Sequence, residues 1–296
     1  MENIEKQFIN LGQVTLHVVT AGDKDGEPVV LLHGFPEFWY GWRKQIPFLV
    51  EKGYRVIVPD QRGYNLSDKP TGRANYTLDI LAQDAAKLIE ALGYDKVNLV
   101  GHDWGGVISW VIAAQYRDKL KKLVVLNAPS ASVVTQEFLN GNLEHMLRMS
   151  YQGFFNLPII PEVLISLNDY KTFGKGLQAN ATQGAFSDED IEQYRRAWAQ
   201  PNAMTSMLNY YRANSNLSGF TKLSKKQHIT TPTLMLWGEK DSALVKEMAQ
   251  PSMDLVEDGE LVFFPHATHF IQHDAPDSVN EEIYNFISKP IAEPVV

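Results

Sequence analysis

The fold of this chain is decided by the stretch Leu99-Val100-Gly101-His102-Asp103-Trp104-Gly105-Gly106. Residues 95–100, which lead into it, read as a short buried strand, because they include apolar and β-branched residues. Residues 107–114, which follow it, read as a helix too apolar to lie at the surface. Between the two stands Asp103, with a glycine two residues before it and another two residues after it. This spacing is typical of the nucleophile elbow, a tight strand-to-helix turn usually written G-x-S-x-G.

An aspartate at this turn restricts the chemistry. A free aspartate titrates near pH ~4, so its carboxylate is already ionised at neutral pH. It can displace a leaving group at a saturated carbon and form an ester, which water then cleaves at the carboxyl carbon. A serine would form an ether there, which water cannot cleave. Asp103 therefore predicts displacement or ring opening at carbon followed by ester hydrolysis, with a simple helix N-cap as the structural alternative.

Composition limits the remaining choices. The chain has 296 residues, of which 44% are hydrophobic, enough for one large α/β domain or a domain with an insertion. A net charge of -8 argues against a nucleic-acid partner. No apolar run is long enough to span a bilayer, and residues 1–6 lack the apolar core of a signal peptide, so we expect a cytoplasmic protein without membrane contact. The chain has no cysteine, which excludes disulfides and a thiolate nucleophile.

Short apolar strands alternate with helical stretches over most of the chain. This alternation predicts an α/β fold with a mainly parallel sheet and helices on both faces. An opening hairpin is expected over residues 6–10 and 14–19, and a helix from about Thr77, its N-cap, to residue 92. Further strands are expected at 28–32, 55–59, 122–126, 233–237 and 260–264, and further helices at 40–52 and 277–287.

The alternation stops after Pro129. Residues 130–227 are rich in Phe, Tyr, Met, Asn and Gln, with helical stretches near 136–152 and 188–199. We expect this block to be an inserted helical lid, or cap, over the carboxyl ends of the strands, where open α/β sheets bind ligands. Residues 1–129 and 228–296 would then form the core domain.

The water that cleaves an Asp103 ester needs a base, and the base needs an acid that orients it. In the elbow fold these follow the nucleophile in the chain order acid, histidine. His269, just after the last apolar strand, is the expected base, with His266 as its rival. Asp241, after the preceding strand, is the expected acid, with Glu239 as the alternative. The acid could also follow the strand one earlier, but the residue there is Asn127, which carries no charge. We expect Asn127 to have a structural or loop-positioning role.

The oxyanion that forms during ester hydrolysis needs aligned N–H donors. In folds with this elbow, one donor is the backbone N–H of the residue after the nucleophile, here Trp104. The second comes from the loop after an earlier strand, here Phe35 in His33-Gly34-Phe35-Pro36. Both donors are backbone groups, and an ordinary turn is the alternative for the second.

Four motifs together resemble the α/β-hydrolase fold epoxide hydrolases, and the similarity covers nearly the whole chain. The resemblance implies the α/β-hydrolase fold and addition of water to a small-molecule epoxide, giving a vicinal diol without a metal or organic cofactor. The motifs are His33-Gly34-Phe35-Pro36-Glu37, Asp60-Gln61-Arg62-Gly63-Tyr64, Gly101-His102-Asp103-Trp104-Gly105-Gly106 and Ala267-Thr268-His269-Phe270.

The family opens epoxides with two lid tyrosines that hydrogen-bond and protonate the departing oxygen. The first resembles Tyr151, although Asn156 stands where the family usually has glutamine, and the second resembles Tyr211 in the family's aromatic-Tyr-Arg pattern. Phenols are neutral donors at pH 7, which suits this role. Packing with the hydroxyl at the surface is the alternative for each tyrosine.

Other residues fit the resemblance less specifically. In some family members Glu37 and His102 hold a water network, but a solvated glutamate and a hydrogen-bonded core histidine explain them equally well. An apolar substrate pocket is expected from aromatic side chains that could equally be ordinary core: Trp39, Trp42, Phe154, Phe155 and Phe270.

Two other functions stay open. A haloalkane dehalogenase uses the same aspartate and would need N–H donors for halide; Trp104 is present, Phe35 replaces the usual asparagine, and Trp198 in the lid could serve. The other is a catalytically silent ligand-binding protein on the same scaffold. The oligomeric state is expected to be a monomer or a homodimer.

Overall fold

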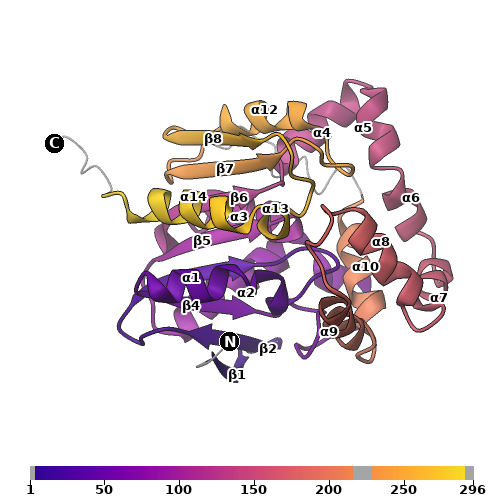
Figure 1. Ribbon diagram of the computed structural model, residues 1–296, viewed down its shortest axis with the longest axis horizontal. Helices are drawn as coiled ribbons and strands as arrows, with labels where there is room; N and C mark the ends of the chain where they lie inside the picture. The colour runs from indigo at the N-terminus through magenta and orange to yellow at the C-terminus, as the bar shows by residue number, and fades with distance from the viewer. Residues whose placement is uncertain (1–3, 216–227, 291–296) are drawn as a thin grey trace.

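One eight-stranded sheet runs through the protein (Figure 1), which a computed structural model describes for residues 4–215 and 228–290. The strand order is β1-β2-β4-β3-β5-β6-β7-β8, and all pairs from β4 to β8 are parallel. The hairpin β1–β2 joins this parallel part through an antiparallel pair with β4. The strands are β1 (Ile4–Asn10), β2 (Thr15–Ala21), β3 (Glu27–Leu32), β4 (Tyr54–Pro59), β5 (Val97–His102), β6 (Leu120–Leu126), β7 (Thr233–Gly238) and β8 (Gly259–Phe264).

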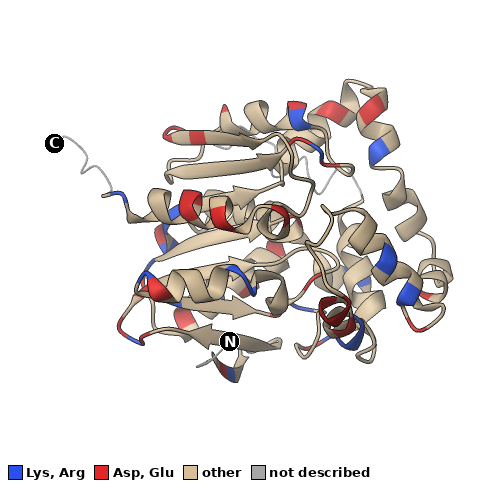
Figure 2. Cartoon of the chain, in the orientation of Figure 1, with Lys and Arg blue, Asp and Glu red and all other residues tan. Residues whose placement is uncertain are grey.

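Helices cover both faces of the sheet. Helices α1 (Gln45–Glu51) and α14 (Pro276–Ser288) pack together on one face, and α2 (Leu78–Ala91) and α3 (Trp104–Gln115) pack together on the other. The strands β4, β5 and β7 are buried along their whole length, as parallel strands covered on both faces should be. Figure 2 shows the charged residues mostly on the outer helices and loops, while the central strands are nearly free of them. The predicted α/β architecture is confirmed.

Short helices complete this part of the chain. They are η1 (Trp39–Trp42), η2 (Arg73–Tyr76), η3 (Arg117–Lys119), η4 (Lys246–Met248), α12 (Ala249–Met253) and α13 (Ile271–Asp274). None of the helices within the two described ranges is long and apolar enough to cross a membrane.

Among the described residues between β6 and β7, all regular secondary structure is helical. In Figure 1 these helices lie beyond the carboxyl ends of the parallel strands, with α6 and α7 far from the sheet. We call residues 131–214 the cap segment. The division into a core of 1–129 and 228–296 and a lid of 130–227 stays a prediction, and its boundary at residue 227 lies outside the described residues. The helices are α4 (Ala131–Leu139), α5 (Leu143–Arg148), α6 (Tyr151–Phe155), α7 (Ile160–Ser166), α8 (Lys171–Ala179), α9 (Asp188–Trp198) and α10 (Ala203–Asn214).

Two predicted helices are interrupted. The helix expected at 40–52 consists of the 3₁₀ turn η1 followed by α1. Helix α1 begins at Gln45, which places Pro47 in its first turn, where the missing N–H of proline is tolerated. The helix expected at 136–152 is three helices, α4, α5 and α6. The first break falls at Gly141, whose φ of 70° is not helical, and the Asn142 side chain then caps α5 by accepting a hydrogen bond from the His145 N–H.

The start of α2 also differs from expectation. The helix begins after Thr77, as predicted, but the Thr77 side chain makes no capping hydrogen bond. Instead, the Asn214 side chain of α10 accepts a hydrogen bond from the Leu78 N–H at 3.1 Å. A residue of the cap segment therefore satisfies an amide of the core that the local sequence leaves open.

Candidate active site

Asp103 sits at the turn between β5 and α3 with φ 52° and ψ -121°, a conformation that is strained for any residue but glycine. The flanking glycines allow close backbone crossing, since a Cβ on Gly105 would lie 2.1 Å from the Leu32 carbonyl oxygen. The Asp103 side chain makes no helix-capping hydrogen bond. Instead, its Oδ1 accepts a hydrogen bond from the Phe35 N–H at 2.7 Å. The structure thus disfavours the N-cap alternative.

His269 and Asp241 meet at this carboxylate. The His269 Nε2 lies 3.4 Å from Asp103 Oδ2, and its Nδ1 donates to Asp241 Oδ2 at 2.8 Å. Asp241 is fixed in turn, because it accepts hydrogen bonds from the Ala243 and Leu244 amides and from the Asn127 side chain. The three side chains therefore form a continuous line, in the order expected for a nucleophile, a base and an acid.

The charges of this line reinforce one another. Burial alone would lower the pKa of His269, but the carboxylates of Asp241 and Asp103 outweigh burial and hold this pKa well above its usual range. Burial alone would raise the pKa of Asp241, but His269 and Asn127 hold it below its usual range. The two carboxylates therefore favour the protonated form of the His269 imidazole.

The rival residues lie elsewhere. His266 is exposed and lines neither cavity at Asp103. Glu239 pairs with Lys246 at the surface, away from His269. Of the alternatives considered for base and acid, His269 is the histidine that contacts Asp103, and Asp241 is the carboxylate that contacts His269.

A cavity of about 310 Å³ opens above Asp103 between the core and the cap segment. Its walls are mainly aromatic, and Tyr151 from α6 and Tyr211 from α10 border it together with His269. The two tyrosine rings meet edge to face, with centroids 6.0 Å apart. Burial raises the pKa of both phenols, so they remain protonated proton donors at neutral pH.

The neighbouring Tyr210 behaves differently. Its hydroxyl donates to the Arg62 carbonyl at 2.7 Å, so it joins the cap segment to the core. Tyr211, not Tyr210, borders the cavity, in agreement with the placing implied by the resemblance.

The expected oxyanion donors lie at the nucleophile. The Phe35 amide already donates to Asp103, as described above. Trp104 is the first residue of α3, so its N–H is one of the four amides at a helix start that have no partner within the helix.

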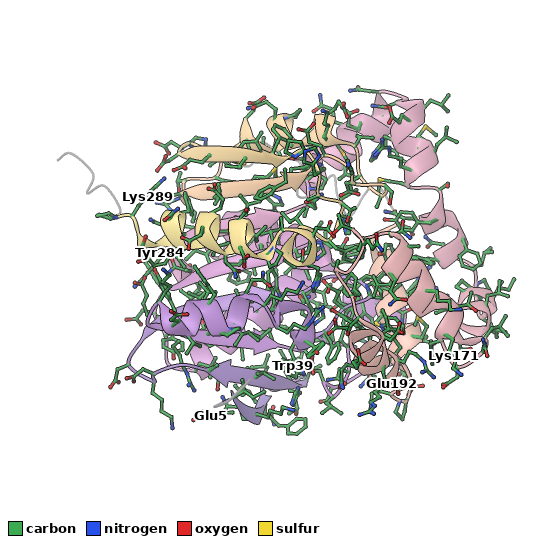
Figure 3. All side chains as sticks on the ribbon, in the orientation of Figure 1. Glu5, Trp39, Lys171, Glu192, Tyr284 and Lys289 are labelled. Carbon is green, nitrogen blue, oxygen red and sulfur yellow. The ribbon has the colours of Figure 1, made fainter. Side chains whose placement is uncertain are left out.

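The structure brings only some of the expected pocket residues to this cavity. Phe155 and Phe270 line the cavity, whereas Phe154 packs behind Phe155 with ring centroids 5.9 Å apart. The expectation for Trp39 is wrong: it lies by the β1–β2 hairpin with Lys6 Nζ 5.2 Å above its ring (Figure 3). Trp39 is the first residue of η1, and Trp42, its last residue, is also buried and does not line the cavity.

Several cavity residues carried no signal in the sequence. Phe173 and Leu177, four residues apart on one face of α8, line the wall opposite Phe35, and Asn180 and Ser242 form the rim. The spacing of Phe173 and Leu177 could have indicated an apolar helix face, but such spacing does not show which surface the face covers.

Glu37 is not solvated but lies buried behind the nucleophile, with 1% of its surface exposed. Its Oε1 accepts hydrogen bonds from the Tyr194 hydroxyl and from His273 Nε2, both at 2.7 Å, and its Oε2 accepts one from Gln272 at 2.9 Å. His102 Nδ1 lies 3.2 Å from the same oxygen. We call Glu37, His102, Tyr194, Gln272 and His273 the Glu37 cluster.

This cluster also reaches the base. The Nε2 of His102 donates to the backbone carbonyl of His269 at 2.8 Å, which fixes the loop that carries the imidazole. Arg43 extends the cluster by donating to His273 Nδ1 at 3.0 Å and pairing with Asp190 of α9. Burial alone would raise the pKa of Glu37, but His273 and His102 hold it well below its usual range.

Across residues 4–215 and 228–290, no group of three or more His, Cys, Asp or Glu side chains has the arrangement of a metal site.

Comparisons with known proteins agree with this geometry. A family model described as the alpha/beta hydrolase fold matches residues 27–276. The chain is 42% identical over 290 residues to the AB hydrolase superfamily protein YfhM of Bacillus subtilis, covering 97% of this chain and 99% of that protein. It is 40% identical over 280 residues to epoxide hydrolase 4 of Homo sapiens, covering 92% of this chain and 75% of that protein.

A solved structure is similar over the same length. A variant of an epoxide hydrolase from Bacillus megaterium superposes with a TM-score of 0.86 at 29% identity, covering 96% of this chain and 100% of that one. The chain therefore belongs to the α/β hydrolase fold family and, within it, to the epoxide hydrolases. The expected fold and enzyme class are confirmed.

Proposed function

We propose that the protein adds water to an epoxide to give a vicinal diol through an ester on Asp103. The observation that carries this proposal is the placing of one carboxylate, one carboxylate-oriented imidazole and two protonated phenols around a single apolar cavity. Two of the proteins compared above, from Homo sapiens and Bacillus megaterium, are named epoxide hydrolases, which supports the same reaction class. We infer that the cap segment acts as a lid, because it supplies both phenols.

In the first step, a carboxylate oxygen of Asp103 bonds to a ring carbon while the bond from that carbon to the ring oxygen breaks. The ring oxygen keeps the bonding electrons and takes a proton from Tyr151 or Tyr211. Two donors disperse the charge of the departing alkoxide, as donors placed where charge develops generally do. The product of this step is an ester of Asp103 and a tyrosinate.

In the second step, His269 Nε2 takes a proton from water, and the water oxygen bonds to the ester carbonyl carbon. The amides of Phe35 and Trp104 stabilise the resulting oxyanion. The bond from the carbonyl carbon to the alcohol oxygen then breaks and restores Asp103. The two protons of the water end on the alcohol and on His269, which returns to its protonated form, so the net change is the addition of one water.

Ester formation itself prepares the base. The negative charge of Asp103 is one of the factors that raise the pKa of His269 in the resting site. Esterification removes that charge, so the pKa of His269 falls and its Nε2 proton passes to the tyrosinate. The neutral imidazole can then take a proton from water.

The haloalkane dehalogenase alternative has less support. The indole N–H of Trp198 donates to the Pro36 carbonyl at 2.6 Å, so it is not free to bind a halide in the cavity. Phe35 contributes only its backbone amide, which already bonds to Asp103. A displaced halide also needs no proton, which would leave the two phenols without a role.

An isotope experiment tests the proposal. Excess enzyme is mixed with styrene oxide in H₂¹⁸O for a single turnover. We expect the diol to carry unlabelled oxygen and the ¹⁸O to appear in a peptide containing Asp103, because the new diol oxygen comes from the carboxylate. Labelled diol together with an unlabelled Asp103 would show direct attack by water and overturn the ester mechanism. Absence of diol from a panel of epoxides, with halide released from haloalkanes, would favour the dehalogenase.

A further inference from the structure

Two cavities of very different size meet at the reacting groups. Asp103, Tyr151 and Tyr211 border the large cavity of about 310 Å³ and also a small one of about 50 Å³. An epoxide whose oxygen faces the tyrosines and whose carbon faces Asp103 therefore directs the substituents of its two carbons toward opposite cavities. We call these cavities the large arm and the small arm.

The large arm suits an extended apolar group. Aromatic rings of Phe35, Phe155, Phe173 and Phe270 line its walls. Its rim is formed by exposed polar residues that hydrogen-bond to each other, Asn180 and Ser242, at 3.2 Å. A substituent in this arm can therefore pack against aromatic faces and extend past the rim toward solvent.

The small arm is closed by buried and half-buried apolar side chains. Trp104, Ala128 and Pro129 come from the core, and Val134 and Met149 come from the cap segment. A cavity of ~150 Å³ is needed to hold benzene in a protein interior, and one water occupies ~30 Å³ of liquid. A space of about 50 Å³ accepts hydrogen or a methyl group but not a phenyl ring.

We propose that the substrates are epoxides with one apolar, aromatic substituent, whose other ring carbon carries only hydrogen or a methyl group, and that Met149 sets this limit. This inference rests on the proposed function and specifies its substrate class. Met149 is the residue to test. It directly follows α5, and its unbranched side chain borders the small arm. Shortening this side chain enlarges the arm without changing the core strands.

Three probes measure the limit: styrene oxide, trans-β-methylstyrene oxide and trans-stilbene oxide. The last carries a phenyl ring on each carbon, so no binding orientation keeps a ring out of the small arm. We expect kcat/KM for trans-β-methylstyrene oxide within about tenfold of that for styrene oxide, because the methyl group fits the small arm and its effect should lie at the low end of the roughly 10–200-fold that one methylene can cause. For trans-stilbene oxide we expect a loss of more than about 100-fold.

The Met149→Ala variant should raise the ratio of kcat/KM for trans-stilbene oxide to that for styrene oxide by at least about tenfold. Met146→Ala is the matched control, because Met146 lies in α5, is exposed, and lines neither arm. It should leave the ratio unchanged within about twofold. Val134→Ala enlarges the same arm by a smaller amount and provides the test if Met149→Ala does not fold.

Each outcome separates this inference from the proposed function. If none of the three probes gives diol, the proposed function fails and the substrate class fails with it. If the wild-type enzyme hydrolyses trans-stilbene oxide within tenfold of styrene oxide, the function stands and the size limit is wrong. If the folded Met149 and Val134 variants leave the ratio within twofold, the small arm does not select substrates.

Discussion

Asp103 must satisfy two opposing demands at one position. Its backbone conformation costs on the order of 1–3 kcal/mol for a residue other than glycine, yet the reaction needs a side chain with a carboxylate there. Surrounding contacts hold the turn, including the Phe35 amide on Oδ1 and His269 beside Oδ2. Strain that persists at a buried, well-connected turn is typical of a functional site.

Asp103→Ala should abolish diol formation, because the other carboxylate at His269, that of Asp241, bonds to Nδ1 and does not line the cavity. Position 103 can keep the same backbone conformation with alanine, so the variant should remain folded, which circular dichroism measures. Asp118→Ala, at an exposed position, is the control and should keep wild-type turnover. Retention of activity within tenfold in a pure Asp103 variant would remove this residue from the mechanism.

His269→Gln should separate the two steps. Ester formation needs no base, whereas ester hydrolysis does, so the covalent intermediate should accumulate. Intact-protein mass spectrometry after mixing with styrene oxide should show the protein plus one epoxide, and peptide mapping should place the adduct on Asp103. Unchanged turnover without an adduct would contradict the role of His269, and an adduct on another residue would contradict the role of Asp103.

Removing the two cavity hydroxyls should slow only the first step. General-acid assistance is typically worth roughly 10²–10⁴-fold, and two donors can partly replace each other. Tyr151→Phe or Tyr211→Phe alone should therefore slow single-turnover ester formation measurably, and the double variant should nearly eliminate it.

Tyr210→Phe is the matched control for these variants. It removes a buried hydrogen bond to the Arg62 carbonyl, so it should lower stability by about 1 kcal/mol while leaving the ester-forming rate near that of the wild type. A Tyr151/Tyr211 double variant that alkylates Asp103 at the parental rate would make the two tyrosines packing residues and favour the dehalogenase.

At the scale of elements, the loop after β3 and the turn after β5 are in direct contact. A Cβ on Gly34 would lie 2.4 Å from both the Cβ and the Oδ1 of Asp103, closer than real side chains approach. The loop that supplies the Phe35 amide can therefore lie against the nucleophile only because residue 34 is glycine.

Gly34→Ala should displace Asp103 or the Phe35 amide and lower kcat for diol formation by about 100-fold, since misplacement by 1 Å can cost that much. Gly153→Ala in α6 is the control, because nothing lies within 4 Å of its added Cβ, and alanine in a helix is favoured over glycine. Single-turnover rates for both variants provide the measurement. Wild-type rates for Gly34→Ala would show that the loop can move without consequence.

At the scale of the whole molecule, the Glu37 cluster joins four separate parts of the fold. Glu37 follows β3, His102 ends β5, Tyr194 belongs to α9 of the cap segment, and Gln272 and His273 belong to α13. Since the carboxylate is buried among these groups, removing its charge should destabilise the assembly as a whole.

Glu37→Gln should lower the free energy of unfolding at pH 7 by on the order of 3 kcal/mol. The pKa of Glu37 is lowered on folding, so its stabilisation is fully present above the unfolded value of 4.5 and is lost as the pH falls through the folded pKa. The difference between wild type and variant should therefore be constant from pH 7 to pH 5 and shrink below pH 4.5.

Urea unfolding across this pH range measures that difference. Glu257→Gln is the control, because Glu257 and its partner His228 are both largely exposed, and it should change stability by less than about 0.5 kcal/mol at any of these pH values. A wild-type advantage at Glu37 that grows as the pH falls would have the wrong sign and contradict the ionised, buried carboxylate.

The sequence by itself determined the order of strands and helices, the elbow at Asp103 and the choice of His269 and Asp241 over their neighbours. These features depend on local causes. Side-chain period reports which face of an element is buried, glycine spacing reports where backbones cross, and parallel strands end at the same edge of a sheet. Residues at the carboxyl ends of neighbouring parallel strands therefore lie close together, however the other segments of the chain pack.

Only the tertiary structure decided which side chains border the cavity and which hold the site from behind. Trp39 and Phe155 are both aromatic residues near site motifs, yet one packs by the β1–β2 hairpin and the other lines the cavity. The partners of Glu37 include Tyr194 and His273, 157 and 236 residues away in the chain. Such contacts depend on where the cap helices and α13 pack against the core, and no local periodicity or propensity encodes that placement.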